Sequence, residues 1–121
     1  MLTVVSVNRG NAIIFRCSGR IVAGEKARAL YNNVIFRPGK HVVVLDLTRV
    51  SRIDAAGLGV LASLRQWAFI AGIRLQLIPS QAVQEVLDLM GLRSHFEIRR
   101  SVSALNVPAD PLEDRAIEGR G

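Results

Sequence analysis

HVVVLDLTRVSRIDAAGLGVLASLRQWAFIAG, residues 41–72, is the stretch that decides the fold of this chain. Its first part, His41 to Leu47, is a nearly continuous run of β-branched residues and leucine, which is typical of a strand that helices cover on both faces of a parallel sheet. A short loop and a helix follow it. The stretch therefore predicts a soluble α/β domain.

The entry into this helix can be predicted position by position. Asp54 is a preferred N-cap residue, because its carboxylate can accept hydrogen bonds from amides of the first turn and suits the positive end of the helix dipole. Ile53 and Leu58 have the spacing of a hydrophobic staple. Gly57 is costly inside a helix but allows another backbone to come close. Gly72 stands where a C-cap glycine would end the helix.

The helix after Asp54 carries two apolar stripes at about 100° per residue. The first should face the sheet, and Trp67 lies near its edge, where we expect partial burial. The second is interrupted by Arg65, and two interpretations of it stay open: it packs against a neighbouring helix or the tail of the chain, or it binds a partner. The first stripe consists of Val60, Leu61, Leu64, Ala68 and Ala71, and the second of Leu58, Ala62 and Phe69.

The remaining elements follow from apolar periodicity and from turn residues. Asn and Gly at residues 8–11 separate two apolar runs, which is typical of a β-hairpin. Ser80 is a suitable N-cap for a last helix, and Gly91 can end it. The predicted elements are a hairpin of residues 3–8 and 12–18, a helix with Ala23, Ala27, Leu30 and Val34 on one face, a strand at 73–78, a helix that buries Val83, Val86, Leu87 and Met90, and a short strand around Phe96 and Ile98.

The regular pattern ends at about residue 100. We therefore expect one domain over residues 1–100 and a C-terminal tail over residues 101–121, which has two prolines and mixed charge and should be partly disordered. Residues 117–120, Ile-Glu-Gly-Arg, also spell the recognition sequence of a protease that is used to remove tags. A native tail and a tag remnant both stay open, and neither carries a function.

The composition argues against several classes of protein. The length of 121 residues suits one domain with a sizeable core, and no uninterrupted apolar segment is long enough to span a bilayer. The first residues lack the layout of a signal peptide, so we expect a cytoplasmic protein without membrane insertion. The net charge of +6 comes from arginines dispersed over every element, which favours a solvated surface over DNA binding.

Groups that could support catalysis or bind a metal are few. The single cysteine, Cys17, cannot form an internal disulfide, and it lies in a strand-like run where a small buried residue is expected. His41 and His95 stand at strand edges, and Asp46 should end a strand and order the loop after it. The sequence contains no Walker-type phosphate loop, no metal-ligand cluster and no nucleophile elbow. We therefore expect no enzyme activity, no metal site and no cofactor.

The run LDLTRVSRIDAAGLGVLASLR, residues 45–65, resembles the central motif of STAS domains, the family of the anti-sigma factor antagonists. The usual motif is an Asp-Ser-Ser-Gly-Leu-Gly turn after a hydrophobic strand, and Asp54, Gly57, Leu58 and Gly59 match it. The run SQAVQEVLDLMGL, residues 80–92, resembles the family's last helix with its Gly-Leu ending. Over residues 3–100 the resemblance implies a STAS-like α/β domain, a mixed sheet of an N-terminal hairpin plus parallel strands with helices packed on it.

The turn also departs from the motif. In family members that a serine kinase switches, the second residue after the aspartate is a Ser or Thr that takes the phosphate, and that position is Ala56 here. The first is Ala55, so neither position has a hydroxyl. A phosphate would place about two negative charges beside Asp54 and block a partner. We therefore expect this chain to lack the serine switch.

The resemblance implies a regulatory module that binds a protein partner, an anti-sigma factor of the ATPase-kinase type, and thereby frees a sigma factor. Two alternatives stay open: an adaptor subunit of a lipid-transport ATPase complex, and a module that binds a nucleotide or other anion at the helix N-terminus. The charge of Asp54 argues against the second, and a homodimer through the second stripe is compatible with all three. The residues expected to bind the partner are Asp54, Ala55, Ala56, Gly57, Leu58, Ala62 and Arg65.

Overall fold

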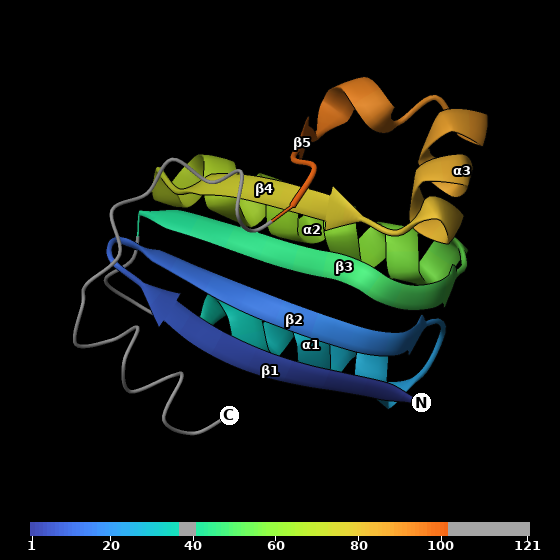
Figure 1. The fold of residues 1–121 in the computed structure, drawn as a ribbon, viewed down its shortest axis with the longest axis horizontal. Helices are drawn as coiled ribbons and strands as arrows, with labels where there is room; N and C mark the ends of the chain where they lie inside the picture. The colour runs from blue at the N-terminus through green and yellow to red at the C-terminus, as the bar shows by residue number, and fades with distance from the viewer. Residues whose placement is uncertain (37–40, 102–121) are drawn as a thin grey trace.

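A computed structural model describes residues 1–36 and 41–101, and Figure 1 shows how these residues fold. The predictions for the tail, including residues 117–120, therefore lie outside the described residues. In chain order the elements are β1 (Leu2–Arg9), β2 (Ala12–Ile21), α1 (Glu25–Ile35), β3 (Val42–Ile53), α2 (Ala55–Ala71), β4 (Arg74–Pro79), α3 (Gln81–Leu89), the 3-10 helix η1 (Arg93–His95) and β5 (Glu97–Ile98).

The strands form one mixed sheet in the order β1-β2-β3-β4-β5. β1 and β2 are antiparallel and are joined by a tight turn, in which Gly10 has a φ of 61° that favours glycine. Each later pair of neighbouring strands is parallel, which requires crossover connections, and α1, α2 and α3 lie on them. This arrangement confirms the predicted fold class, an N-terminal hairpin plus parallel strands with helices packed on the sheet.

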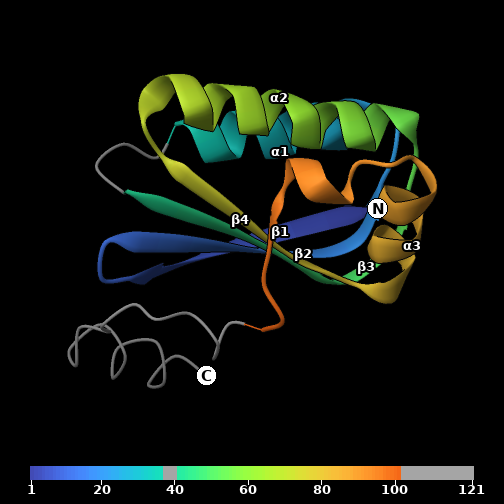
Figure 2. The ribbon, with the colours of Figure 1, turned by 90° about the horizontal axis from the view of Figure 1, so that it is seen from above.

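The helices gather on one side of the sheet. Figure 2 shows α1 and α2 side by side over one face, and residues of all three helices belong to one main core with side chains of the strands, for example Leu30, Leu61 and Leu87 with Phe15 and Leu45. The opposite face carries a smaller buried cluster, made of strand residues alone: Ile14, Val44 and Ile78. In the part of the chain that the structure describes, helices cover only one face of this sheet. The expectation that helices cover both faces of the strand that begins after His41 is therefore wrong.

The central strand is longer than predicted. β3 continues past Leu47 to Ile53, because β2 runs on to Ile21 and provides a backbone partner over this length, whereas β4 pairs with β3 only as far as Leu47. Asp46 consequently lies inside the strand and does not end it. One carboxylate oxygen of Asp46 accepts hydrogen bonds from the backbone amide of Thr48 at 3.1 Å and from its hydroxyl at 2.7 Å.

The two later helices begin and end where predicted. Asp54 caps α2, Gly72 ends it with a φ of 71°, and Ser80 caps α3 by accepting a hydrogen bond from the amide of Val83 at 3.2 Å. Gly91 has the left-handed conformation expected after α3. These signals are correct because each depends on contacts within one helical turn.

Three predicted burial assignments are wrong. Ala23 precedes α1 and is exposed, because β2 extends to Ile21 and the helix begins only at Glu25. Ala71 is exposed in the last turn of α2. Met90 is 58% exposed, since α3 ends at Leu89 and the chain turns away there. Among the described residues no helix has both the length and the apolar character needed to cross a membrane.

Candidate functional site

The site expected from the sequence begins where β3 passes into α2. Asp54 occupies this junction with an extended backbone, and one oxygen of its carboxylate accepts a hydrogen bond from the amide of Gly57 at 2.9 Å. The other oxygen accepts one from the amide of Ala23 at 3.0 Å. These two donors, with Gly57 the stronger, hold the pKa of Asp54 below its usual value. The side chain therefore stays ionised at neutral pH and binds two segments of the chain together.

Gly57 brings the end of β2 against the first turn of α2. A Cβ atom at this position would lie 2.1 Å from the carbonyl oxygen of Ile21, a distance that no side chain can occupy. The same carbonyl oxygen accepts a hydrogen bond from the amide of Asp54 at 3.3 Å. The predicted close approach of another backbone is confirmed, and the backbone that approaches is the end of β2.

The residues of the turn divide between the surface and the interior. Ala55 and Ala56 are exposed, and Asp54 is half-buried. Gly57 and Leu58 are buried, and Leu58 belongs to the main core. A partner that approaches the turn can therefore touch the two alanines, whereas Gly57 and Leu58 act by fixing the shape of the turn.

A groove lies beside the turn, between α1 and α2. Its volume is about 580 Å³, and residues of both helices line it: Ala23, Gly24, Ala27, Arg28, Tyr31, Asn32, Ala56, Gly59, Val60 and Ser63. Most of these side chains are small, while Arg28 and Tyr31 supply a cation and an aromatic ring. The sequence did not lead us to expect that α1 forms one wall of this groove. The spacing of Arg28 and Tyr31, three residues apart on a helix next to the buried Ala27, was the signal that could have found it.

Ala62 and Arg65 do not belong to this groove. They are exposed on the other flank of α2, where they line a second groove with residues of β4, η1 and β5. The seven residues expected to bind the partner are thus not one surface. The structure brings Asp54, Ala55 and Ala56 together at the turn, keeps Gly57 and Leu58 inside, and places the other two around the helix.

The histidines and the cysteine of the chain do not form a catalytic or metal-binding cluster among the described residues. His41 and His95 are exposed, and no group of three or more His, Cys, Asp or Glu that could hold a metal occurs among residues 1–36 and 41–101. Cys17 is buried, as predicted, and burial first and the charge of Asp46 second raise the pKa of its thiol to about 12. A thiol in this state is a poor nucleophile.

Comparison of the sequence with models of protein families identifies one family. The sequence model of the STAS domain family matches residues 3–105. None of the curated proteins matches the sequence significantly.

Solved structures with the same fold include two that are described as anti-sigma factor antagonists. A putative one from Thermotoga maritima is 22% identical, with 100% of this chain and 96% of that chain covered and a TM-score of 0.71. One from Mycobacterium paratuberculosis is 20% identical, with 85% and 89% covered and a TM-score of 0.70. A structure of Mglu is 26% identical over 65% of this chain, with a TM-score of 0.58, and the match spans only 20% of that longer chain.

Proposed function

Because the chain belongs to the STAS domain family, we propose that it is a non-enzymatic regulatory module that binds a protein partner through the Asp54 turn and the start of α2. The observation that carries the proposal is the exposure of Ala56 at the rim of the α1–α2 groove. The turn below it is fixed by the two hydrogen bonds of Asp54. A rigid, exposed turn beside a groove suits docking, because little conformational entropy is lost when a partner binds.

The partner in this proposal is an anti-sigma factor of the ATPase-kinase type, and the chain acts as its antagonist in the cytoplasm. The fold shared with two proteins that are described as anti-sigma factor antagonists supports this choice. The carboxylate of Asp54 already accepts a hydrogen bond from the amide of Gly57 at the helix N-terminus, and this disfavours the anion-binding alternative. No DNA contact is part of the proposal.

The proposal includes the loss of the serine switch. Ala56 has no hydroxyl, so a kinase cannot place a phosphate at the position where the family motif carries Ser or Thr. Binding is then insensitive to the kinase activity of the partner. The two exposed alanines also leave the turn without a side chain that would block an approaching surface.

The test is a binding titration with each anti-sigma factor of the kinase type encoded in the source genome, with and without ATP. Wild type should bind one of them, keep its mass after incubation with ATP and bind equally well afterwards. Ala56→Asp should bind at least about tenfold more weakly, because it puts a charge into the contact. Ala56→Ser should gain one phosphate in the presence of ATP and then lose binding. Ala71→Asp, at the exposed far end of α2, is the matched control and should bind like wild type.

Three outcomes contradict the proposal. A stoichiometric phosphate on the wild-type chain would mean that a kinase switch exists at another residue. Equal binding by wild type and Ala56→Asp would place the contact away from the turn. If a transporter ATPase binds and no kinase-like protein does, the adaptor alternative replaces the antagonist.

A further inference from the structure

The helical layer leaves part of the sheet open. Helices pack about 10 Å apart and strands about 4.8 Å apart, so one helix covers roughly two strands. α1 and α2 lie side by side over one face, and the sheet has five strands in all (Figure 2). On the far side of α2, toward the β5 edge, the described residues provide no third long helix. A second groove lies there.

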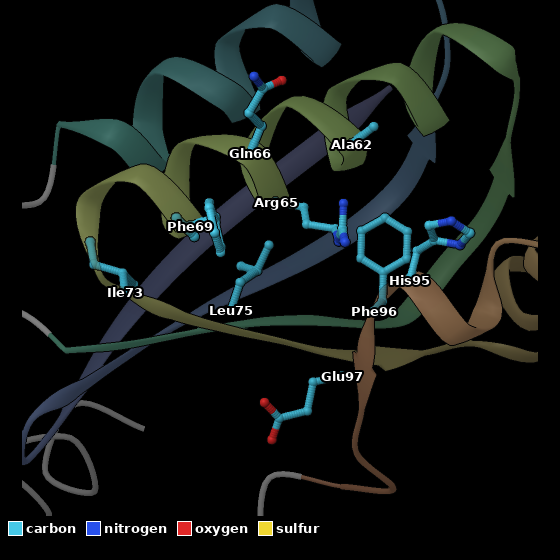
Figure 3. Close-up of a pocket in the computed structure, with 10 residues that line it drawn as sticks. Ala62, Arg65, Gln66, Phe69, Ile73, Leu75, His95, Phe96 and Glu97 are labelled. Atoms are coloured by element: carbon cyan, nitrogen blue, oxygen red, sulfur yellow. The ribbon is translucent and has the colours of Figure 1, made fainter.

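This groove, which we term the α2–β5 groove, has a volume of about 570 Å³. Figure 3 shows the side chains of Phe69, Leu75 and Phe96 turned toward one space between α2 and η1. One wall belongs to α2, the other to η1 and β5, and β4 contributes the floor. The lining residues are Ala62, Arg65, Gln66, Ala68, Phe69, Ile73, Leu75, His95, Phe96 and Glu97.

The apolar side chains of the α2–β5 groove are unusually open. Phe69 is 86% exposed. Leu75 and Phe96, in the groove itself, are only half-buried. A single exposed apolar residue is ordinary, whereas several that face one concave surface make that surface a candidate for binding.

Glu97 and Arg65 both line the groove, but within the described part of the chain only Glu97 has a partner of opposite charge. Glu97 is already paired, because its carboxylate accepts hydrogen bonds from the guanidinium of Arg74 at 2.6 and 2.8 Å and from the amide of Gln76 at 2.8 Å. Arg65 points toward Phe96 in Figure 3 and makes no hydrogen bond or ion pair with any of the described residues. The groove therefore offers apolar surface and one uncompensated positive charge.

We propose that the α2–β5 groove is a second docking site, and that it binds an acidic amphipathic helix of another protein. The helix lies beside α2 in the place of a third helix of the layer, with its apolar face on Phe69, Leu75 and Phe96 and a carboxylate opposite Arg65. The net charge of +6 favours an acidic partner as well. The site is separate from the Asp54 turn, so it does not depend on the proposed function.

The test uses two labelled peptides of about 17 residues, the length of α2, and the full chain. Both carry leucines at helical spacing on one face; one has glutamates beside this face and the other has lysines at the same positions. Fluorescence anisotropy should show the glutamate peptide binding at least about fivefold more tightly. Arg65→Glu should reduce that ratio at least about fivefold or reverse it. Phe69→Asp should weaken the glutamate peptide at least tenfold.

Leu89→Asp is the matched control, because Leu89 on α3 is 84% exposed and lies outside the groove. It should bind both peptides like wild type, and thermal unfolding should show all three variants folded. The proposal is wrong if neither peptide binds, if Arg65→Glu leaves the ratio unchanged, or if Leu89→Asp weakens binding as much as Phe69→Asp. It is also wrong if wild type sediments as a dimer that Phe69→Asp dissociates, since a second copy then fills the groove.

Discussion

The carboxylate of Asp54 accepts a hydrogen bond from the backbone amide of Ala23, which lies 31 residues earlier in the chain, at 3.0 Å. Its other oxygen caps α2 through the amide of Gly57. One side chain thus fixes the start of α2 and the segment that leads from β2 into α1. These two helices form the groove beside the turn, so the shape of the candidate site depends on Asp54 even where Asp54 itself is not touched.

Substitutions of Asp54 should show how much its hydrogen bonds with Gly57 and Ala23 stabilise the fold. Asp54→Ala removes both acceptors and should lower Tm by roughly 4–8 °C. Asp54→Asn keeps one carbonyl oxygen for one of the two donors, so its Tm should lie between those of Asp54→Ala and wild type. Thermal unfolding followed by circular dichroism gives the order, and amide hydrogen exchange at Ala23 and Gly57 shows which bond is lost. Equal Tm values for all three proteins would mean that neither bond stabilises the fold.

The same carboxylate predicts a pH dependence of stability. The pKa of Asp54 is lower in the folded chain than in the unfolded chain, because the Gly57 and Ala23 amides stabilise the ionised form. Its stabilising contribution is therefore complete above the unfolded pKa of about 3.9 and is lost as the pH falls through the folded pKa. The difference in Tm between wild type and Asp54→Asn should shrink over the pH range below about 4. A difference that stays constant over this range would contradict the prediction.

Two glycines of α2 should respond in opposite directions to alanine. Gly57→Ala puts a Cβ 2.1 Å from the Ile21 carbonyl oxygen and should destabilise the fold by about 1–3 kcal/mol or more. Gly59→Ala is the control, because a Cβ there meets nothing within 4 Å, and alanine is about 1 kcal/mol more favourable than glycine inside a helix. Urea unfolding of both variants measures the difference. Stabilisation by Gly57→Ala would show that helix propensity, and not the contact with Ile21, decides at residue 57.

The local parts of the fold could be predicted from the sequence. The caps of α2 and α3 depend on hydrogen bonds of Asp54, Gly72 and Ser80 with backbone groups of the adjacent helical turn, and all three caps are correctly predicted. The end of β3 could not be predicted in this way. The segment after Leu47 is rich in Thr, Arg and Ser, which is typical of a loop, and it becomes a strand because β2 continues beside it.

The candidate site was predictable only where its residues are consecutive. The turn from Asp54 to Leu58 is visible in the sequence, but the bond to Ala23 and the α1 wall with Arg28 and Tyr31 depend on how α1 packs beside α2. The same packing separates Ala62 and Arg65 from the turn, since opposite flanks of one helix face different neighbours.

The thiol of Cys17 should be inert in the folded chain. Burial, with the charge of Asp46 as a smaller cause, raises its pKa to about 12, so the thiolate fraction at pH 8 is on the order of a thousandfold lower than for a free cysteine. Reaction with a disulfide reagent at pH 8 should therefore be much slower in buffer than in urea, where the chain is unfolded. Labelling within minutes in buffer would show that β2 opens readily around Cys17.

Two large apolar residues on α2 should differ sharply in their contribution to stability. Leu64 is fully buried in the main core, so Leu64→Ala should cost about 2–5 kcal/mol of unfolding free energy, for the lost transfer of the side chain and the cavity left behind. Phe69 lies five residues further along the same helix and is almost fully exposed, so Phe69→Ala should change the free energy by no more than about 0.5 kcal/mol. Urea unfolding followed by circular dichroism measures both. If Phe69→Ala cost as much as 2 kcal/mol, Phe69 would be covered in the isolated chain, and the α2–β5 groove would already be filled before any partner arrives.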